Sequence, residues 1–250
     1  ESLLDTYEAE RRPVAEQNCA ESHTNFEKIW EVIRALGLDP KGMELFARLV
    51  NSRPMRTLPR GMRHAVIRTL AWFPKQLIGR ALRPGKTRER VGRAIESQIN
   101  HFDRLGLDIG YVYKHGAVVP VDEETPSVAN RVTDYVPSTR PGARLPHAWI
   151  ETDEGRRSTL DSVSYDEFRL LVGAEAARTL PSDLMHHVRV VDTGRFPERL
   201  FPPDGALLVR PDGHVAWRIK GDKLDTDAVR AALNRVLCIK QESAETGEVV

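Results

Sequence analysis

The stretch that decides the fold of this chain is ALLVRPDGHVAWR, residues 206–218. Two apolar runs of strand length, 206–210 and 214–218, flank Pro211-Asp212-Gly213, the strongest turn signal in the sequence. A short link that contains glycine, set between two such runs, predicts an antiparallel hairpin with Gly213 at positive φ. Because side chains alternate along a strand, we expect Trp217 to share a face with Val215 and Ile219 and to pack under the last helix.

Outward from this hairpin the pattern is that of an α/β domain. Residues 168–173 and 187–191 are strand-like runs, and 174–184 between them is rich in Ala and Leu, as a helix would be. A closing helix is predicted after Asp225 or Thr226, which would cap it. Its buried face would carry Val229, Leu233, Val236 and Leu237. The order strand, helix, strand, hairpin, helix predicts a thioredoxin-like domain over 135–240, followed by a polar tail over 241–250.

Residues 1–134 are predicted to form a helical segment that ends in a strand. Pro13 is expected to stop the first helix and to begin the next. Apolar residues recur at helical spacing from Phe26 to Leu36, and Gly37 follows as a C-cap.

Further helices are predicted near Leu45–Val50, over 65–81 and over 91–105. The Arg- and Pro-rich stretch 53–63 between them reads as a loop. Residues 107–113 alternate as a half-buried strand does, and 121–131 reads as an exposed polar loop. The predicted fold class is therefore α/β, an N-terminal helical segment followed by a thioredoxin-like domain.

Composition excludes several classes of protein. The 250 residues carry 37 basic and 36 acidic side chains, a net charge of +1, which gives no general attraction for nucleic acid or an acidic membrane. No apolar run approaches the ~20 residues that span a bilayer. Two cysteines, Cys19 and Cys238, exclude a disulfide framework and suit a reducing cytoplasm. We therefore expect a cytoplasmic protein that binds neither nucleic acid nor membrane; a nucleic-acid surface over Arg53–Arg93 is disfavoured because interleaved aromatic residues are missing.

Redox and nucleotide motifs are missing from the sequence. Where a thioredoxin carries Cys-x-x-Cys, this chain has Gly173-Ala174-Glu175-Ala176, so thiol–disulfide exchange there is excluded. There is no G-x-G-x-x-G and no Walker loop, and Gly85-Lys86 lacks the rest of a phosphate cradle. We therefore assign no catalytic, cofactor-binding or metal-binding residue to this chain.

Two histidine-containing groups invite a functional reading that the residues do not support. His186-His187 is a poor chelate, because adjacent side chains point in different directions. Ser158 and Asp161 with His147 would suit a hydrolase triad, but no G-x-S-x-G elbow accompanies them. We read both groups as structural.

The densest unusual segment runs from Tyr135 to Ile150, where three prolines and a glycine restrict the backbone. Arg140, Arg144 and His147 are its candidate functional residues. Arginines can each bridge several carbonyl or carboxylate groups, so we favour a rigid strap that docks the α/β domain onto the helices. Binding of an anion or substrate by the arginines is the alternative.

Four stretches resemble class A flavoprotein aromatic hydroxylases, in the order in which they occur in that family. LLDTYEAERRPVA, residues 3–15, is similar to the segment that closely follows their second FAD-binding motif. GLDIGYVY, residues 106–113, the strap with Ser158–Asp161, and the hairpin 206–218 resemble later stretches. The resemblance is strongest to the phenol and dichlorophenol hydroxylases.

This resemblance implies the C-terminal part of an enzyme that uses FAD and NADPH to transfer one oxygen atom to a phenol. The family's dinucleotide motifs are not in this sequence, so neither cofactor is expected on this chain. The expected partners are the N-terminal FAD-binding portion of the same enzyme and a second copy in a homodimer. A start at Glu1 without methionine also favours a piece of a longer protein. The alternative is a stand-alone, redox-inactive thioredoxin-like binding module.

Overall fold

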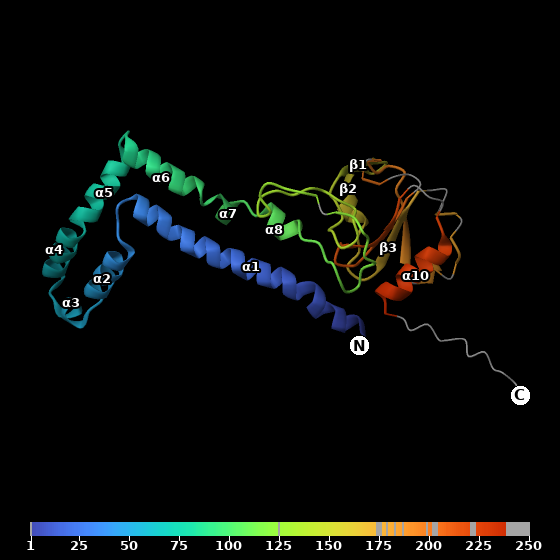
Figure 1. The fold of residues 1–250 in the computed structure, drawn as a ribbon, viewed down its shortest axis with the longest axis horizontal. Helices are drawn as coiled ribbons and strands as arrows, with labels where there is room; N and C mark the ends of the chain where they lie inside the picture. Colours follow the sequence, from blue (N-terminus) through green and yellow to red (C-terminus); the bar gives the residue numbers. More distant parts are fainter. Residues whose placement is uncertain are drawn as a thin grey trace, which may run out of the picture. The chain divides into compact units, whose positions relative to one another are not determined.

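The computed structural model describes residues 2–124, 126–173, 177–178, 180–182, 184–186, 188–198, 200–201, 205–220 and 224–238. The chain divides into two compact units (Figure 1). The first comprises Glu1–Glu16 and Leu105–Val250, and the second comprises Gln17–Arg104. The boundary predicted between residues 134 and 135 concerns folding domains and stays a prediction.

The first unit is built on a four-stranded sheet with the order β4-β3-β5-β6. β3 (Phe168–Val172) pairs in parallel with β4 (Val188–Asp192) and antiparallel with β5 (Ala206–Val209). β5 in turn pairs antiparallel with β6 (Val215–Ile219), which confirms the predicted hairpin. Gly213 has φ +80°, as the turn predicts.

The closing helix α10 (Thr226–Val236) is confirmed, and the Asp225 side chain caps it by accepting from the Asp227 amide. The helix predicted over 174–184 falls largely outside the described residues, as do His187 and the tail 241–250. η2 (Leu184–His186) is a short 3-10 helix before β4.

Both faces of the sheet are covered, because the strands are apolar on both sides. One face, the helix-side core, packs against α10 (Figure 1). It includes Leu170, Val172, Leu208, Trp217, Val229 and Leu233. The other face, the strap-side core, joins the sheet to the segment 145–150 and to the loop after β4. It includes Leu145, Ile150, Leu171, Phe196, Leu207 and Val215.

A β-bulge in the hairpin corrects one prediction. Leu208 pairs with Trp217, but Val209 pairs with Val215, so Ala216 is an extra residue on β6. Trp217 lies in the helix-side core, as expected, with Ile219 packed against it. Val215 instead lies in the strap-side core, because the extra residue shifts the alternation by one place.

A small hairpin precedes the main sheet. β1 (Trp149–Thr152) pairs antiparallel with β2 (Gly155–Ser158). The 3-10 helix η1 (Thr159–Ser162) follows β2 and begins with a capping box, in which the Ser158 hydroxyl accepts from the Leu160 amide and Asp161 accepts from the Ser158 amide.

The strand predicted over 107–113 is wrong for its first half. Leu105–Ile109 form the short helix α8, and Val112 makes one antiparallel bridge with Ala143. At Gly106 a Cβ atom would collide with the carbonyl oxygens of Asp134 and Arg131, so a close backbone approach here sets the conformation. The loop predicted over 121–131 contains no helix or strand among its described residues.

Pro13 does not end the first helix, contrary to the prediction. α1 runs from Ser2 to Ala35 with Pro13 inside it, and Gly37 at φ +81° ends it as predicted. Proline removes one helical hydrogen bond. Contacts on the preceding turn offset this loss, because Glu10 and Arg11 both bond to other parts of the first unit.

The second unit consists of helices with few buried side chains. After the shared helix α1 it contains α2 (Pro40–Val50), α3 (Arg53–Thr57), α4 (Arg60–Leu70), α5 (Trp72–Leu82), α6 (Lys86–Glu96) and α7 (Ile99–Phe102). Polar contacts link α1 to the last turns of the unit: Gln98 Nε2 donates to Lys28 O at 3.0 Å, and Arg90 Nε donates to Ala35 O at 2.9 Å.

The stretch 53–63, predicted as a loop, forms α3 and the start of α4 instead. Its prolines stand where a helix tolerates them: Pro54 lies in the first turn of α3, and Pro59 is the N-cap of α4. Arginine is a good helix former, so the composition that reads as a loop also suits two short helices.

Candidate functional site

A group of mutually bonded polar side chains lies in the first unit, where α1 meets the β5–β6 hairpin. Arg210, the residue after β5, donates to Glu10 Oε1 at 2.7 Å and to Glu10 Oε2 at 2.9 Å. Glu10 Oε1 also accepts from the backbone amide of Ala117 at 2.7 Å. The Glu10 side chain is 3% exposed and that of Arg210 is 12% exposed, so the ion pair is shielded from water.

Arg210 also holds the hairpin turn. Its guanidinium donates to Asp212 at 2.8 Å and 3.1 Å, and Nδ1 of His214 lies 3.4 Å from Asp212 Oδ1. Burial alone would raise the pKa of Asp212, but the contact with His214 and the charge of Arg210 outweigh it and lower that pKa to about 2. The turn carboxylate therefore stays ionised over the whole neutral range.

Two tyrosines cover this group. The rings of Tyr111 and Tyr113 lie 5.3 Å and 4.5 Å from the buried ring of His214, and Arg11 donates to both hydroxyls, at 3.2 Å and 3.0 Å. Burial raises the pKa of Tyr113 to about 12, although the hydrogen bond from Arg11 opposes the rise. These contacts hold α1 to the hairpin; none of them leaves an acid or base facing a cavity.

The strap residues predicted from sequence lie along the hairpin. Gly142 N donates to Val215 O at 2.7 Å, and Leu145 N donates to Gly213 O at 2.8 Å, so the strap continues the sheet beside β6. The Arg140 amide donates to Ser138 Oγ, and Arg144 pairs with His214 in a backbone bridge. Burial raises the pKa of Tyr135, and the charge of Arg144 opposes that rise. The role of these arginines between domains stays a prediction.

His147 is exposed and meets a serine. Its Nδ1 lies 2.8 Å from Ser158 Oγ, and its ring packs edge-on against Trp149 at 4.8 Å. Asp161 does not complete a triad, because it accepts from the Ser158 backbone and not from His147. The Ser158 hydroxyl is also engaged as the N-cap acceptor of η1. Ser158 therefore caps η1 while its hydroxyl also contacts the exposed ring of His147, which agrees with a structural role.

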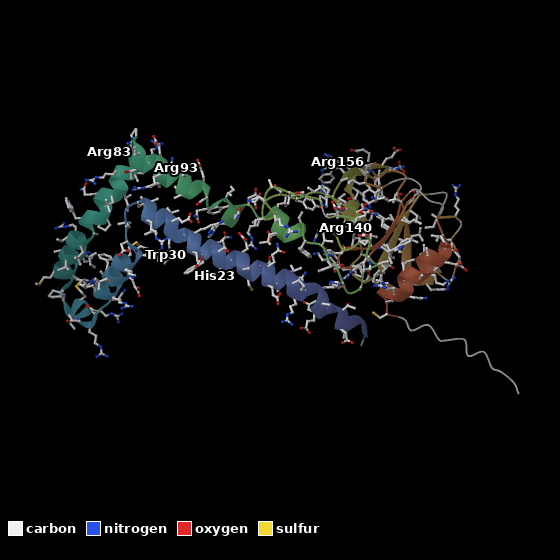
Figure 2. All side chains as sticks on the ribbon, in the orientation of Figure 1. His23, Trp30, Arg83, Arg93, Arg140 and Arg156 are labelled. Atoms are coloured by element: carbon white, nitrogen blue, oxygen red, sulfur yellow. The ribbon has the colours of Figure 1, made fainter. Side chains whose placement is uncertain are left out.

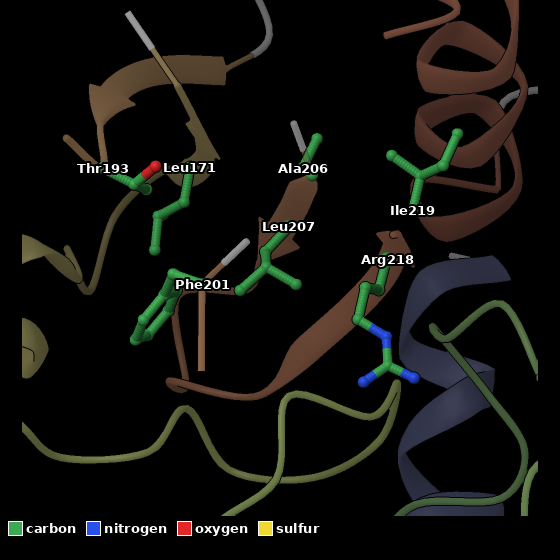
Figure 3. A pocket seen from close by; sticks show the side chains of 8 residues that line it. Leu171, Thr193, Phe201, Ala206, Leu207, Arg218 and Ile219 are labelled. Atoms are coloured by element: carbon green, nitrogen blue, oxygen red, sulfur yellow. The ribbon is translucent and has the colours of Figure 1, made fainter. Parts of the chain in front are cut away.

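A small, mostly apolar hollow lies at one end of the sheet (Figure 3). Leu171, Phe201, Leu207 and Ile219 are its large apolar lining residues. Arg218 is its one charged lining residue, and that guanidinium is already engaged by Glu123 at 2.5 Å and Thr139 at 3.1 Å. Thr193 contributes a hydroxyl to the lining, and no Asp, Glu, His, Cys or Lys is among the described lining residues.

Arginines on the second unit extend outward. Figure 2 shows Arg83, the C-cap of α5, and Arg93 of α6 on the helices of that unit.

Within the described part of the chain, no three His, Cys, Asp or Glu side chains gather as a metal site would require. The same residues include no helix that is long and apolar enough to cross a membrane.

The described residues do not fit an FAD site. A dinucleotide cradle needs glycines whose open backbone faces the phosphates at a helix start. Here the closest approaches at Gly106 and Gly142 are filled by the chain's own carbonyls, and that at Gly116 by the Glu10 carboxylate. Gly85, the N-cap of α6, has open space but stands without the other glycines of such a motif.

Comparison with known protein families gives a match to part of the chain. A family model described as "Aromatic-ring hydroxylase, C-terminal" matches residues 138–238. That range begins in the strap and ends after α10, so it covers most of the strap, both hairpins and the four-stranded sheet.

Two curated relatives and one solved structure extend the similarity to nearly the whole chain. A 2,4-dichlorophenol 6-monooxygenase of Delftia acidovorans is 31% identical, over 95% of this chain and 40% of the relative. A phenol 2-monooxygenase of Pseudomonas sp. (strain EST1001) is 24% identical, over 97% of this chain and 39% of the relative. The flavin-dependent monooxygenase PieE, solved with FAD and substrate, matches with a TM-score of 0.70 and 27% identity, over 95% of this chain and 40% of that one. The chain thus spans about 40% of the length of these proteins.

Proposed function

We propose that the chain is the C-terminal part of an FAD-dependent aromatic-ring hydroxylase and that it completes the fold of a longer enzyme, since a family model and relatives of that class match it. That enzyme would use FAD, NAD(P)H and O₂ to hydroxylate a phenolic ring. FAD would supply the oxygen activation, and residues outside this chain would hold it. This chain would contribute structure and a dimer surface, and no reacting group.

The observation that carries this proposal is the bare apolar surface of the second unit. α2, α4 and α6 have no buried residue, although each is amphipathic. On α4 the side chains of Met62, Val66 and Leu70 form one exposed stripe at four-residue spacing. A unit that exposes so many apolar side chains is expected to be covered by another protein surface.

Charge indicates what kind of surface that is. Residues 45–88 contain lysines and arginines but no Asp or Glu, whereas the whole chain is nearly neutral. The covering part of the enzyme is therefore expected to present acidic side chains to these helices. The relatives have enough further chain for a covering part, because about 60% of their length lies outside the match.

The C-terminal domain is proposed to be thioredoxin-like. The parallel pair β3–β4, the antiparallel neighbours β5 and β6 and the closing helix α10 support that assignment. Because Gly173-Ala174-Glu175-Ala176 has no cysteine, the domain would serve packing and recognition rather than thiol exchange.

The test is to read the coding sequence ahead of Glu1 and to express the longer protein. We expect about 350 further residues with a G-x-G-x-x-G motif, an estimate from typical domain sizes. The longer protein should oxidise NAD(P)H in a phenol-dependent way and release a hydroxylated product. A start codon next to Glu1, with a cellular protein of 28.2 kDa, would support the stand-alone binding module instead.

Self-association gives a second test of the bare surface. The isolated chain should form dimers or larger species in light scattering, because its apolar stripe lacks a cover. A variant in which Met62, Val66 and Leu70 are all replaced by Ser should be more monomeric than the unchanged chain. Tyr165→Ser is the matched control, since Tyr165 is 94% exposed and belongs to the first unit and not to that stripe.

A further inference from the structure

The first four turns of α1 are attached to the first unit almost entirely by polar groups. Among the described side chains of residues 4–16, Glu10 is the buried one, whereas Leu4 is 77% exposed and Tyr7 is 66% exposed. As far as the described residues show, neither core of the sheet includes a residue from this stretch. Hydrophobic burial therefore contributes little to the docking of these turns.

The polar contacts have a centre and a periphery. At the centre, Glu10 accepts both bonds from Arg210 and one from the Ala117 amide, and Arg210 donates in addition to Ala117 O at 3.3 Å. At the periphery, Arg11 bonds to the hydroxyls of Tyr111 and Tyr113, which cover His214. We call the central set, Glu10, Arg210 and the backbone of Ala117, the latch.

We propose that the latch is a conformational switch, through which residues 2–16 dock onto the hairpin or leave it as one piece while the sheet stays folded. A buried charge that loses its partner must regain water, so loss of either side chain drives the surfaces apart. The ion pair is either bonded and shielded or separated and hydrated, so the docked and the released arrangement are two discrete states.

The latch has a consequence for the rest of the chain. α1 continues past Glu16 into the second unit, so the helix that the latch holds belongs to both units. In the longer hydroxylase the residues ahead of Glu1 would join the cofactor-binding portion; this step rests on the proposed function. The C-terminal domain would then hold that portion through the start of α1.

Hydrogen exchange on the 250-residue chain tests the latch directly. Glu10→Gln keeps the size of the side chain and removes its charge. We expect amides of residues 2–16 to exchange at least about tenfold faster, while those of β3, β5 and α10 keep their protection. Arg12→Gln is the control, because Arg12 pairs with Glu8 and Glu16 on the same helix but is exposed.

A second measurement distinguishes release of residues 2–16 from the hairpin from simple fraying of the end of α1. Release should expose Tyr113, so its titration should move from near 12 towards the ordinary tyrosine value in Glu10→Gln but not in Arg12→Gln. Arg210→Lys keeps a charge but loses the paired geometry and should lie between the two.

Two outcomes overturn the proposal. Exchange of residues 2–16 that is unchanged in Glu10→Gln would show that the ion pair does not hold them. Loss of protection in α10 together with residues 2–16 would show that the turns do not move separately from the sheet. Absence of an upstream coding region would contradict the proposed function and leave this test as it stands.

Discussion

The amide of Val119 donates to the carbonyl of Ala216 at 2.8 Å, so the bulged residue of β6 is paired with the segment after Ala117. A bulge leaves a residue out of its own ladder, and its carbonyl must find another partner when it is buried. Here that partner comes from the segment that also donates to Glu10 through Ala117. The irregularity of the hairpin thus fixes the loop that completes the latch.

Gly213 and Gly61 form a matched pair for testing the hairpin turn. A Cβ atom would have open space at both, but Gly213 has φ +80° whereas Gly61 lies within α4. Gly213→Ala should lower the free energy of unfolding by about 1 kcal/mol, because the left-handed region strains a side chain. Gly61→Ala should raise it by up to about 1 kcal/mol. Equal effects in urea unfolding would contradict the assigned turn.

Local patterns predicted the main sheet and not its irregularities. The apolar runs at 168–173 and 206–218 and the turn Pro211-Asp212-Gly213 led to strands and a hairpin that the structure contains. The bulge at Ala216 cannot be predicted from the sequence pattern, because Val215, Ala216 and Trp217 are all apolar and fit either face of the sheet. The helix end predicted at Pro13 was also wrong, because contacts of Glu10 and Arg11 with residues far along the chain stabilise the helix on both sides of the proline.

Acid should weaken the hairpin through Asp212. Its pKa is lowered from 3.8 to about 2 in the folded chain, so its contribution to stability is complete above about pH 4 and is lost as the pH falls through about 2. At pH 7 Asp212→Asn should be less stable by about 1 kcal/mol, after allowance for solvent screening of a carboxylate that is partly exposed. The difference from wild type should shrink below pH 4; a gap that is constant down to pH 2 would show that the charge contributes nothing.

Titration with alkali should detect the raised pKa of Tyr113. Its pKa of about 12 lies above the ordinary value of 10.0, so the stability it contributes is complete below pH 10 and is lost as the pH rises through about 12. Absorbance titration of the phenolate should contain a component near 12 that Tyr113→Phe removes and Tyr165→Phe leaves in place. A component that Tyr113→Phe removes near pH 10 would be inconsistent with burial of this ring.

Thr159 should anchor the strap. Its hydroxyl is fully buried, donates to Pro146 O at 2.7 Å and accepts from the Ala148 amide at 3.0 Å. Thr159→Val keeps the shape but leaves two buried backbone groups unpaired, at a cost of about 1–3 kcal/mol. Thr69→Val on α4, whose hydroxyl bonds on an exposed surface, should change stability by less than about 0.5 kcal/mol. Similar losses for the two variants would remove the case for a rigid strap.

The candidate site shows where reasoning from sequence ends. His147 and Ser158 lie close together, which their separation of 11 residues did not reveal, yet the surrounding bonds agree with a structural role. Glu10 and Arg210 are 200 residues apart, and each reads as an ordinary surface charge. A lone arginine directly after the apolar run 206–209 is the one local signal that could have pointed to a buried partner.

The flavin content of the purified 250-residue chain tests the central claim most directly, that this part completes a hydroxylase without holding its cofactor. The chain should be mixed with excess FAD, desalted and measured by its absorbance spectrum beside the longer protein. We predict no flavin band in the isolated chain and about one flavin per chain in the longer protein, because the described glycines do not form a phosphate cradle. Close to one flavin per chain in the isolated 250 residues would contradict the account.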